Sequence, residues 1–213
     1  MAVQLFRHHR PGNLHEVPTG RKLQITGDEE ADALLTSSPL ALMIGMLLDQ
    51  QIPLEWAFKG PATLQSRLGG SLDAASIAAM DPGELSSLFS EKPAIHRYPG
   101  SMATRTQALC SALLESYGGD PSAVWSTAAD GLELRSRLVA LPGFGEQKAR
   151  IFIALLGKQR GLQLAGWREA CTPYGDAGSY RSVADIVDGA SLQQVRETKA
   201  AMKQAAKAAR AGT

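Results

Sequence analysis

The 213-residue sequence has little cysteine, few aromatic residues and no long apolar run. Two cysteines are too few for a four-cysteine zinc site or a four-cysteine iron–sulfur cluster. No window reaches about 18 uninterrupted apolar residues, so we expect no transmembrane helix. Aromatic residues make up only 6% of the chain, whereas alanine and leucine are abundant, and this mixture favours helices over a β-sandwich.

The N-terminal residues 1–10 carry the adjacent His8 and His9 and lack the apolar core of a signal peptide. We therefore expect a cytoplasmic protein. In that compartment Cys110 and Cys171 are expected to be free thiols, with a disulfide between them as the alternative. No group of His, Cys, Asp and Glu has metal-ligand spacing, so we expect no metal and no cofactor.

The apolar spacing predicts an all-α fold with almost no strand. We divide the chain into an irregular segment over 1–27, a helical domain over 28–190 and a basic C-terminal helix over 191–213. A short strand is expected at Lys22–Ile25. Helices are expected over 28–35, 39–48, 54–60, 61–68, 73–79, 82–89, 102–117, 120–127, 132–140, 146–156 and 191–209.

The strongest apolar run is Pro39–Leu48, which is apolar on every side. A helix of this kind is expected to be buried. It is followed directly by three polar side chains, Asp49, Gln50 and Gln51. The run therefore predicts a buried helix that presents polar groups at its C-terminal end.

A second pattern, Leu141-Pro-Gly-Phe-Gly145, separates two expected helices. Its glycines permit positive φ and close approach of another backbone. The amides of Gly143 and Gly145 are expected at the N-terminus of the next helix, which attracts phosphate through free N–H groups and the helix dipole. Lys148 and Arg150 would add positive charge there. The alternative is an ordinary turn between helices.

The segment Leu141–Ala149 resembles the hairpin of the helix-hairpin-helix (HhH-GPD) superfamily of base-excision DNA glycosylases. The segment Met46–Ile52, about ninety residues earlier, resembles the buried helix of that family, which ends in a polar pair facing the base pocket. The resemblance covers about residues 28–170. It is closest in style to the alkylpurine branch, because the cysteines of an iron–sulfur cluster are missing.

The resemblance implies a two-lobed all-α fold with a central cleft, and a monomer that acts on double-stranded DNA. Such an enzyme bends the duplex, flips a damaged base and cleaves its N-glycosidic bond. The hairpin residues expected at the DNA are Gly143, Phe144, Gly145, Gln147, Lys148 and Arg150.

The sequence departs from the family at two positions. The lysine that forms a Schiff base in strand-cleaving members is replaced here by Gln147. The neighbouring Lys148 is turned by about 100° along a helix, so we expect it to face phosphate or solvent and expect no AP-lyase chemistry. The family's aspartate, about twenty residues after the hairpin, is replaced by Ala165, or by Gly166 after a one-residue shift.

Asp49 is the candidate that substitutes for the missing aspartate, since a carboxylate in a partly dry site stabilises a cationic sugar. The alternative is that Asp49 caps the next helix. Glu55 is a second candidate, with a plain surface role as its alternative. Glu169 and Asp176 lie too far along the chain for a clear match.

Gln50 and Gln51 would read base edges or hold a water, unless they bond loop backbone instead. Trp56 and Trp167 would stack on the flipped base, with a place in the core as their alternative, and Trp125 is expected in the core. His96 and Tyr98 would probe the DNA groove or wedge the duplex, with a solvated loop as the alternative.

The net charge is only +1, yet the C-terminal segment is basic. Five cations share one helical face: Arg196, Lys199, Lys203, Lys207 and Arg210. Such a stripe neutralises phosphates, and a solvated helix is the alternative. Together these features predict a monofunctional DNA glycosylase. A non-catalytic lesion sensor and a structural helical domain are the competing hypotheses.

Overall fold

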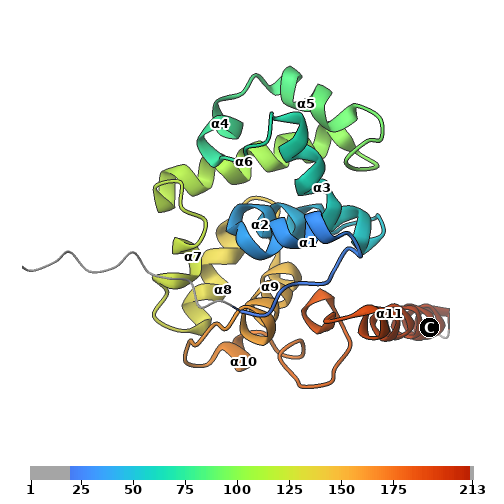
Figure 1. Cartoon of the computed structure of the whole chain (residues 1–213). Coiled ribbons are helices and arrows are strands. Elements are labelled where there is room, and N and C mark those ends of the chain that lie inside the picture. The colour runs from blue at the N-terminus through green and yellow to red at the C-terminus, as the bar shows by residue number, and fades with distance from the viewer. Residues whose placement is uncertain (1–19, 212–213) are drawn as a thin grey trace, which may run out of the picture.

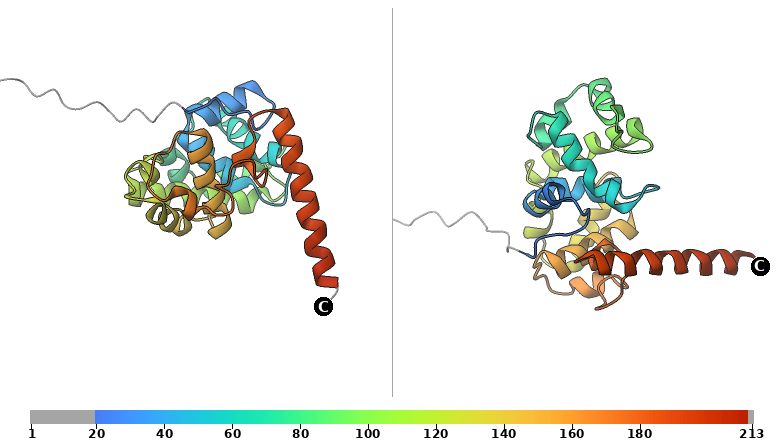
Figure 2. Two further views of the ribbon diagram at one scale, coloured as in Figure 1. Left: turned by 90° about the horizontal axis from the view of Figure 1, so that it is seen from below. Right: turned by 45° about the vertical axis from the view of Figure 1, so that its right-hand side comes forward.

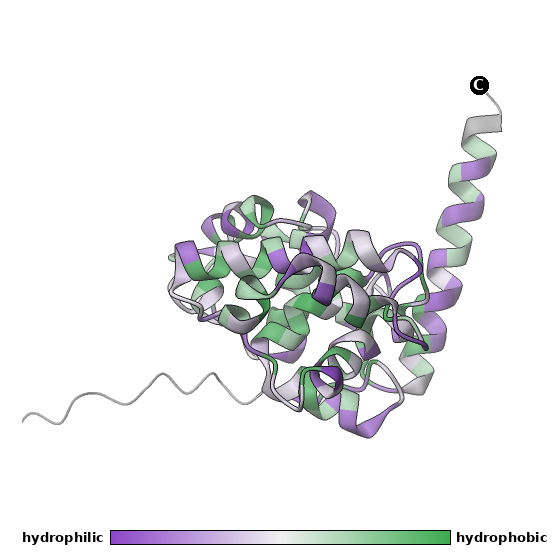
Figure 3. Cartoon of the chain, turned by 90° about the horizontal axis from the view of Figure 1, so that it is seen from above, coloured by the Kyte–Doolittle hydropathy of each residue, from purple (hydrophilic) through white to green (hydrophobic). Residues whose placement is uncertain are grey.

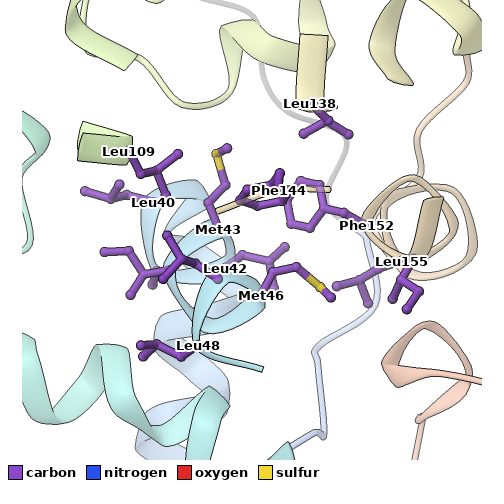
Figure 4. Close-up of a cluster of buried hydrophobic side chains, with 14 of the residues drawn as sticks. Leu40, Leu42, Met43, Met46, Leu48, Leu109, Leu138, Phe144, Phe152 and Leu155 are labelled. Carbon is purple, nitrogen blue, oxygen red and sulfur yellow. The ribbon is translucent and has the colours of Figure 1, made fainter. Parts of the chain in front are cut away.

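Helix α2 (Pro39–Leu48) lies at the centre of the computed structural model, which describes residues 20–211. The side chain of Ser38 caps this helix by accepting a hydrogen bond from the Ala41 amide, and Pro39 occupies its first turn. Every residue from Leu40 to Leu48 is buried, as the apolar pattern predicts. Figure 4 shows side chains of α2 packed among others from α6, α8 and α9.

One group of helices packs on α2 from the middle of the chain. It consists of α3 (Leu54–Arg67), α4 (Ala74–Ala79), α5 (Pro82–Ser90) and α6 (Pro99–Tyr117). Helices α4 and α5 pack on α6, and α3 packs along both α1 (Glu29–Ser37) and α2. This group lies above α2 in Figure 1.

A second group forms from the C-terminal half and lies below α2 in Figure 1. It consists of α7 (Ala123–Ser126), α8 (Gly131–Ala140), α9 (Glu146–Gln159), α10 (Trp167–Ala170) and the 3₁₀ turn η1 (Val183–Asp185). Helices α8 and α9 flank the hairpin and pack together, with α10 against both. Helix α2 contacts α6 of the first group and α9 of the second, so its C-terminal end is placed where the two groups meet.

The last helix, α11 (Gly189–Ala211), is attached only by its first turns. Ser191 and Val195 are buried, and Leu192 packs against the core. All residues whose exposure is described from Lys199 onward are exposed. Figure 2 shows the helix leaving the body as a straight projection, and Figure 3 shows hydrophilic residues recurring along it.

The prediction of an all-α fold is confirmed for residues 20–211, and two details were wrong. Lys22–Ile25 is not a strand, because side chains of α1 hold this segment: the Ile25 amide donates to Asp32 Oδ1 at 3.1 Å. The expected break before Pro61 is also missing. Helix α3 continues through Pro61, which is buried, and Gly60 beside it lies against Leu48, where a Cβ would not fit.

The expectations for residues 1–19 lie outside the described residues. Within the described range, no single helix is long and apolar enough to cross a membrane. Helices α1 and α2 together pass that test by length and composition, and they are bent by 115° at their junction.

Candidate functional site

The C-terminal end of α2 carries the polar triplet that the sequence singled out. Asp49 is the C-cap residue, and its amide donates to the Gly45 carbonyl at 3.1 Å. Gln51 follows with φ of 57°, a left-handed conformation that is uncommon for a residue with a side chain. The chain therefore turns sharply here, and Pro53 then begins α3. Asp49 does not cap that next helix, since α3 has no side-chain cap.

The carboxylate of Asp49 is half-buried and accepts no hydrogen bond from the described residues. Burial raises the pKa of this carboxyl, because the charged form loses hydration. The positive charges of Lys199 and Lys148 oppose that rise. A desolvated carboxylate flanked by two lysines, with its oxygens unused by the fold, is available to interact with a ligand.

We expected Lys148 to face phosphate or solvent, and this expectation was wrong. Its Nζ donates a hydrogen bond to the Leu47 carbonyl in the last turn of α2. Terminal helix carbonyls lack partners within their helix, and a cation is favourable at that end of the dipole. Burial lowers the pKa of Lys148 to about 8, while the charge of Asp49 acts in the opposite direction. Lys148 thus joins the helix after the hairpin to the end of α2.

Gln50 is fully engaged by the fold. Its Nε2 donates to the Leu47 carbonyl at 3.0 Å and to Met102 Sδ at 3.2 Å. Its Oε1 accepts from Arg105 Nη1 at 3.0 Å. The side-chain amide is therefore occupied and has to break these bonds before it can read a base edge. Gln51, in contrast, is exposed.

His96 is a buried residue, so neither expectation for it, a groove probe or a solvated loop residue, was right. It is 1% exposed and its Nε2 lies 2.9 Å from the Gln50 carbonyl. Its Nδ1 accepts from the Tyr98 amide at 3.0 Å, so Nε2 carries the proton and the ring is neutral. Burial lowers the pKa of His96 and favours this neutral form. His96 holds the backbone of Gln50 and Arg105 holds its side chain; Arg105 was not among the residues predicted from the sequence.

Two exposed aromatic side chains stand in segments that adjoin this end of α2: Trp56 in the first turn of α3, and Tyr98 two residues after His96, which bonds the Gln50 carbonyl. Trp56 is 39% exposed and its Nε1 donates to the Ala94 carbonyl at 3.1 Å. Tyr98 is 44% exposed and begins α6 directly after the His96 loop. Trp56 therefore remains a candidate for stacking on a base, and Tyr98 joins it.

Trp167 does not join this site. It is 7% exposed, its ring packs against Gly157 of α9, and Arg168 covers it at 4.3 Å from the ring centroid. A side chain buried in this way belongs to the core, which was the alternative for Trp167. Trp125 lies in the core as expected.

The hairpin has the backbone that the sequence predicts. Gly143 has φ of +83°, and a Cβ there would lie 2.9 Å from Leu47. Gly145 is exposed and begins α9, with open space where a Cβ would stand. Within the described residues, the amides of Gly143 and Gly145 have no hydrogen-bond acceptor. Phe144 is 4% exposed and its ring packs edge-on against Phe152. It is therefore a core residue, and the expectation that it contacts DNA was wrong.

The charged residues that follow the hairpin are partly paired. Glu146 Oε2 lies 3.5 Å from Arg135 Nε and 3.6 Å from Arg150 Nη2. Arg150 also donates to the Thr172 carbonyl at 3.5 Å, so its guanidinium is held by two partners within the protein. Gln147 is exposed, and its Nε2 donates to the Tyr174 hydroxyl at 3.0 Å. Gln147 is thus an exposed residue in the first turn of α9 whose side chain is held by Tyr174.

No carboxylate stands at Ala165 or Gly166. The Gly131 amide donates to the Ala165 carbonyl at 2.8 Å, which fixes this loop against α8. Glu169 and Asp176 are exposed, and Glu55 is paired with Arg196 of α11. Asp49 is the one sequence candidate among these carboxylates that is half-buried without an ion-pair partner in the described residues.

One cavity in the described part of the chain lies apart from Asp49. It has a volume of about 390 Å³ and borders α9, η1 and α11, with Lys158, Gln159 and Arg168 in its wall. Lys158 Nζ binds Asp185 there at 2.6 Å. The expected base pocket at Gln50 and Gln51 is therefore not this cavity.

The described residues contain no group of three or more His, Cys, Asp and Glu that could hold a metal ion. Cys110 and Cys171 are free and buried. Burial raises the pKa of the Cys110 thiol to about 12 and that of Cys171 to about 11, so both remain protonated at neutral pH. Comparison of the chain with protein-family models, curated proteins and solved structures finds no match.

Proposed function

We propose that the chain is a monofunctional DNA glycosylase that cleaves the N-glycosidic bond of a damaged base in duplex DNA. The observation that carries the proposal is the carboxylate of Asp49, which is half-buried, free of hydrogen bonds in the described part of the chain, and beside Lys148. Departure of a base leaves positive charge on the sugar. A fixed carboxylate in a poorly hydrated site stabilises that charge as it develops.

The hairpin supplies the DNA contact in this proposal. The amides of Gly143 and Gly145, which have no acceptor among residues 20–211, stand at the N-terminus of α9, a helix of 14 residues, and attract a phosphate oxygen. Lys148 holds α9 against the last turn of α2, so a phosphate bound at the hairpin keeps a fixed position relative to Asp49. In this proposal the two helical groups around α2 are the two lobes that the resemblance implies.

The extruded base stacks on the exposed faces of Trp56 and Tyr98 in this account, since aromatic rings accept any base. Gln51, exposed at the turn after Asp49, reads the edge of the base. Gln50 positions the loop through Arg105 and His96. Water enters from the exposed side of Asp49 and adds to the sugar after the base departs.

A second candidate function is lesion binding without catalysis. The observation that favours it is the loop at Ala165, where the family's aspartate is absent and the backbone is fixed against α8. A sensor of this kind would use the same hairpin amides and exposed aromatic residues, and Asp49 would have no chemical role.

Base release from duplex oligonucleotides separates the two. Each duplex carries one lesion (an alkylated purine, hypoxanthine, uracil, oxidised guanine or a mismatch), and alkali added afterwards reveals abasic sites. The glycosylase proposal predicts release from at least one lesion and no strand cleavage before alkali. Tight binding with no release from any lesion would favour the sensor, and no binding at low salt would leave only a structural role.

A further inference from the structure

Helix α11 carries a stripe of cations, of which Lys199 borders the proposed active site whereas Lys203 and Lys207 take no part in it. At about 100° per residue, Arg196, Lys199, Lys203 and Lys207 fall within an arc of about 80° on one side of the helix. Lys199, Lys203 and Lys207 are exposed, and none has an ion-pair partner among the described residues. The whole chain has a net charge of only +1, so this stripe is a local feature rather than part of a generally basic surface.

In the first turns of α11, the cationic side of the helix lies next to Asp49 and the start of α3. Arg196 is ion-paired with Glu55 in the first turn of α3, a few residues after Asp49. Lys199, one turn further, is close enough that its charge lowers the pKa of Asp49. Lys203 and Lys207 continue the same side of the helix outward, where the helix has left the body (Figures 2 and 3).

We infer that α11 is an arm that binds the phosphates of duplex DNA to one side of the lesion. The inference rests on the proposed function, because the occupant is the same DNA that the hairpin and Asp49 engage. Charge complementarity selects this partner: a row of unpaired cations on a straight helix matches a regular row of phosphates. From Lys199 to Ala209 the helix extends about 16 Å, which corresponds to about five base pairs of duplex.

The opposite side of α11 offers little for a protein partner to bind. It consists mainly of alanines, with Met202, 49% exposed, as its large apolar side chain. A helix that pairs with a second copy usually presents a continuous stripe of large apolar residues. We therefore favour DNA over a second copy of the chain as the partner, and the test below includes self-association through α11 as the competing outcome.

The test compares Lys203→Gln/Lys207→Gln with Lys203→Arg/Lys207→Arg, which keeps the charge at the same positions. A third variant ends at Ala200 and removes the exposed part of the helix while keeping its buried anchors. Affinity for a lesion duplex with about ten base pairs on each side is measured by fluorescence anisotropy over a range of salt concentrations. We expect the slope of log K against log salt to decrease in magnitude by about 2 in the Gln variant, by about 2 to 3 in the truncated variant, which also lacks Arg210, and to stay unchanged in the Arg variant.

Three results overturn the inference. A wild-type slope in the Gln and truncated variants means that α11 does not contact phosphate. A change of oligomeric state in those variants, with DNA affinity unchanged, means that α11 binds protein. Absence of DNA binding by the wild-type protein at low salt removes both the arm and the proposed function.

Base release at saturating enzyme distinguishes the two proposals. The Gln variant retains Asp49 and is expected to release base at the wild-type rate. Salt slopes that depend on α11 without any base release would keep the arm and refute the glycosylase. Normal base release with slopes that do not depend on α11 would do the reverse.

Discussion

Lys148 donates a hydrogen bond from its Nζ to the carbonyl of Leu47, a residue 101 positions earlier in the chain. The bond joins the helix that follows the hairpin to the last turn of the buried central helix. It also brings a cation beside Asp49, whose carboxylate has no hydrogen bond in the described structure. The candidate DNA contact and the candidate catalytic group are therefore connected through a single side chain.

Replacing Asp49 with Asn is expected to stabilise the fold at neutral pH. The pKa of Asp49 is raised in the folded state, so the folded protein binds more protons than the unfolded chain above the ordinary carboxyl pKa of 3.8. Stability from this group is present at low pH and is lost as pH rises through the folded pKa. We expect a higher Tm for Asp49→Asn at pH 7, where about 1 kcal/mol corresponds to about 2–4 °C.

Thermal unfolding at pH 7 and near pH 3.5 measures this effect. The difference between Asp49→Asn and wild type should shrink at the lower pH, because the unfolded chain is then also mostly protonated at Asp49. Asp188→Asn is the matched control, since its pKa is lowered through bonds to Ser191 and its loss should reduce Tm at pH 7. A lower Tm for Asp49→Asn at pH 7 would mean that the fold depends on the Asp49 charge.

Lys148 is expected to titrate near pH 8, well below the ordinary lysine value of 10.5. Because the charge of Asp49 opposes this decrease, Asp49→Asn should lower the pKa of Lys148 further. NMR titration of ¹³C-methylated lysines measures both values, with Lys148→Arg to assign the resonance. The pH dependence of stability from Lys148 is opposite to that from Asp49, because its pKa is lowered in the folded state. The free energy that Lys148 contributes to folding is present above pH 10.5 and is lost as pH falls through about 8. An unshifted Lys148 resonance would contradict its burial at α2.

The two hairpin glycines should respond differently to substitution by alanine. Gly143→Ala forces a side chain into positive φ and against Leu47, so it should destabilise the protein by about 1–2 kcal/mol. Gly145→Ala has open space and a negative φ, so stability should change little. The added methyl should still hinder a phosphate and weaken DNA binding. Denaturant unfolding and DNA titration test the pair, and unchanged DNA affinity in Gly145→Ala would argue against a phosphate at this amide.

Alanine substitution of two tryptophans should distinguish a residue of the base pocket, Trp56, from a residue of the core, Trp167. Trp167→Ala removes a buried ring beside Gly157 and should cost about 3–5 kcal/mol of stability. Trp56→Ala removes a partly exposed ring whose Nε1 bonds the Ala94 carbonyl, so it should cost much less stability. If Trp56 stacks on a base, its loss should weaken lesion binding by about 1–3 kcal/mol. If Trp56→Ala and wild type bind the lesion duplex with the same affinity, and likewise the undamaged duplex, Trp56 does not stack on a base.

The sequence predicted those features that are encoded locally. The uninterrupted apolar run predicted a buried α2, and the glycine spacing predicted the hairpin and its free amides. The placement of Asp49 at the end of a buried helix followed from the same run. These features depend on neighbours within a few residues, so the linear pattern is sufficient to identify them.

The direction of Lys148 was wrong because it was inferred from one step along the helix. Lys148 lies three and four residues before Ile151 and Phe152, which are both buried, and that spacing places it on the inner side of α9. Helical periodicity therefore contained the signal. The roles of His96, Arg105 and Arg196 depend on contacts over 46, 55 and 141 positions, which no local pattern indicates.

Single-turnover base release by Asp49→Asn tests the central claim most directly. With a lesion duplex that the wild-type protein processes, the variant is compared at saturating concentration, and DNA affinity is measured on the same samples. We predict a rate lower by a factor on the order of 10² to 10³, with affinity nearly unchanged, because the carboxylate acts on the charge that develops as the base departs. A variant that releases base at the wild-type rate would contradict the assignment of Asp49 as the catalytic carboxylate.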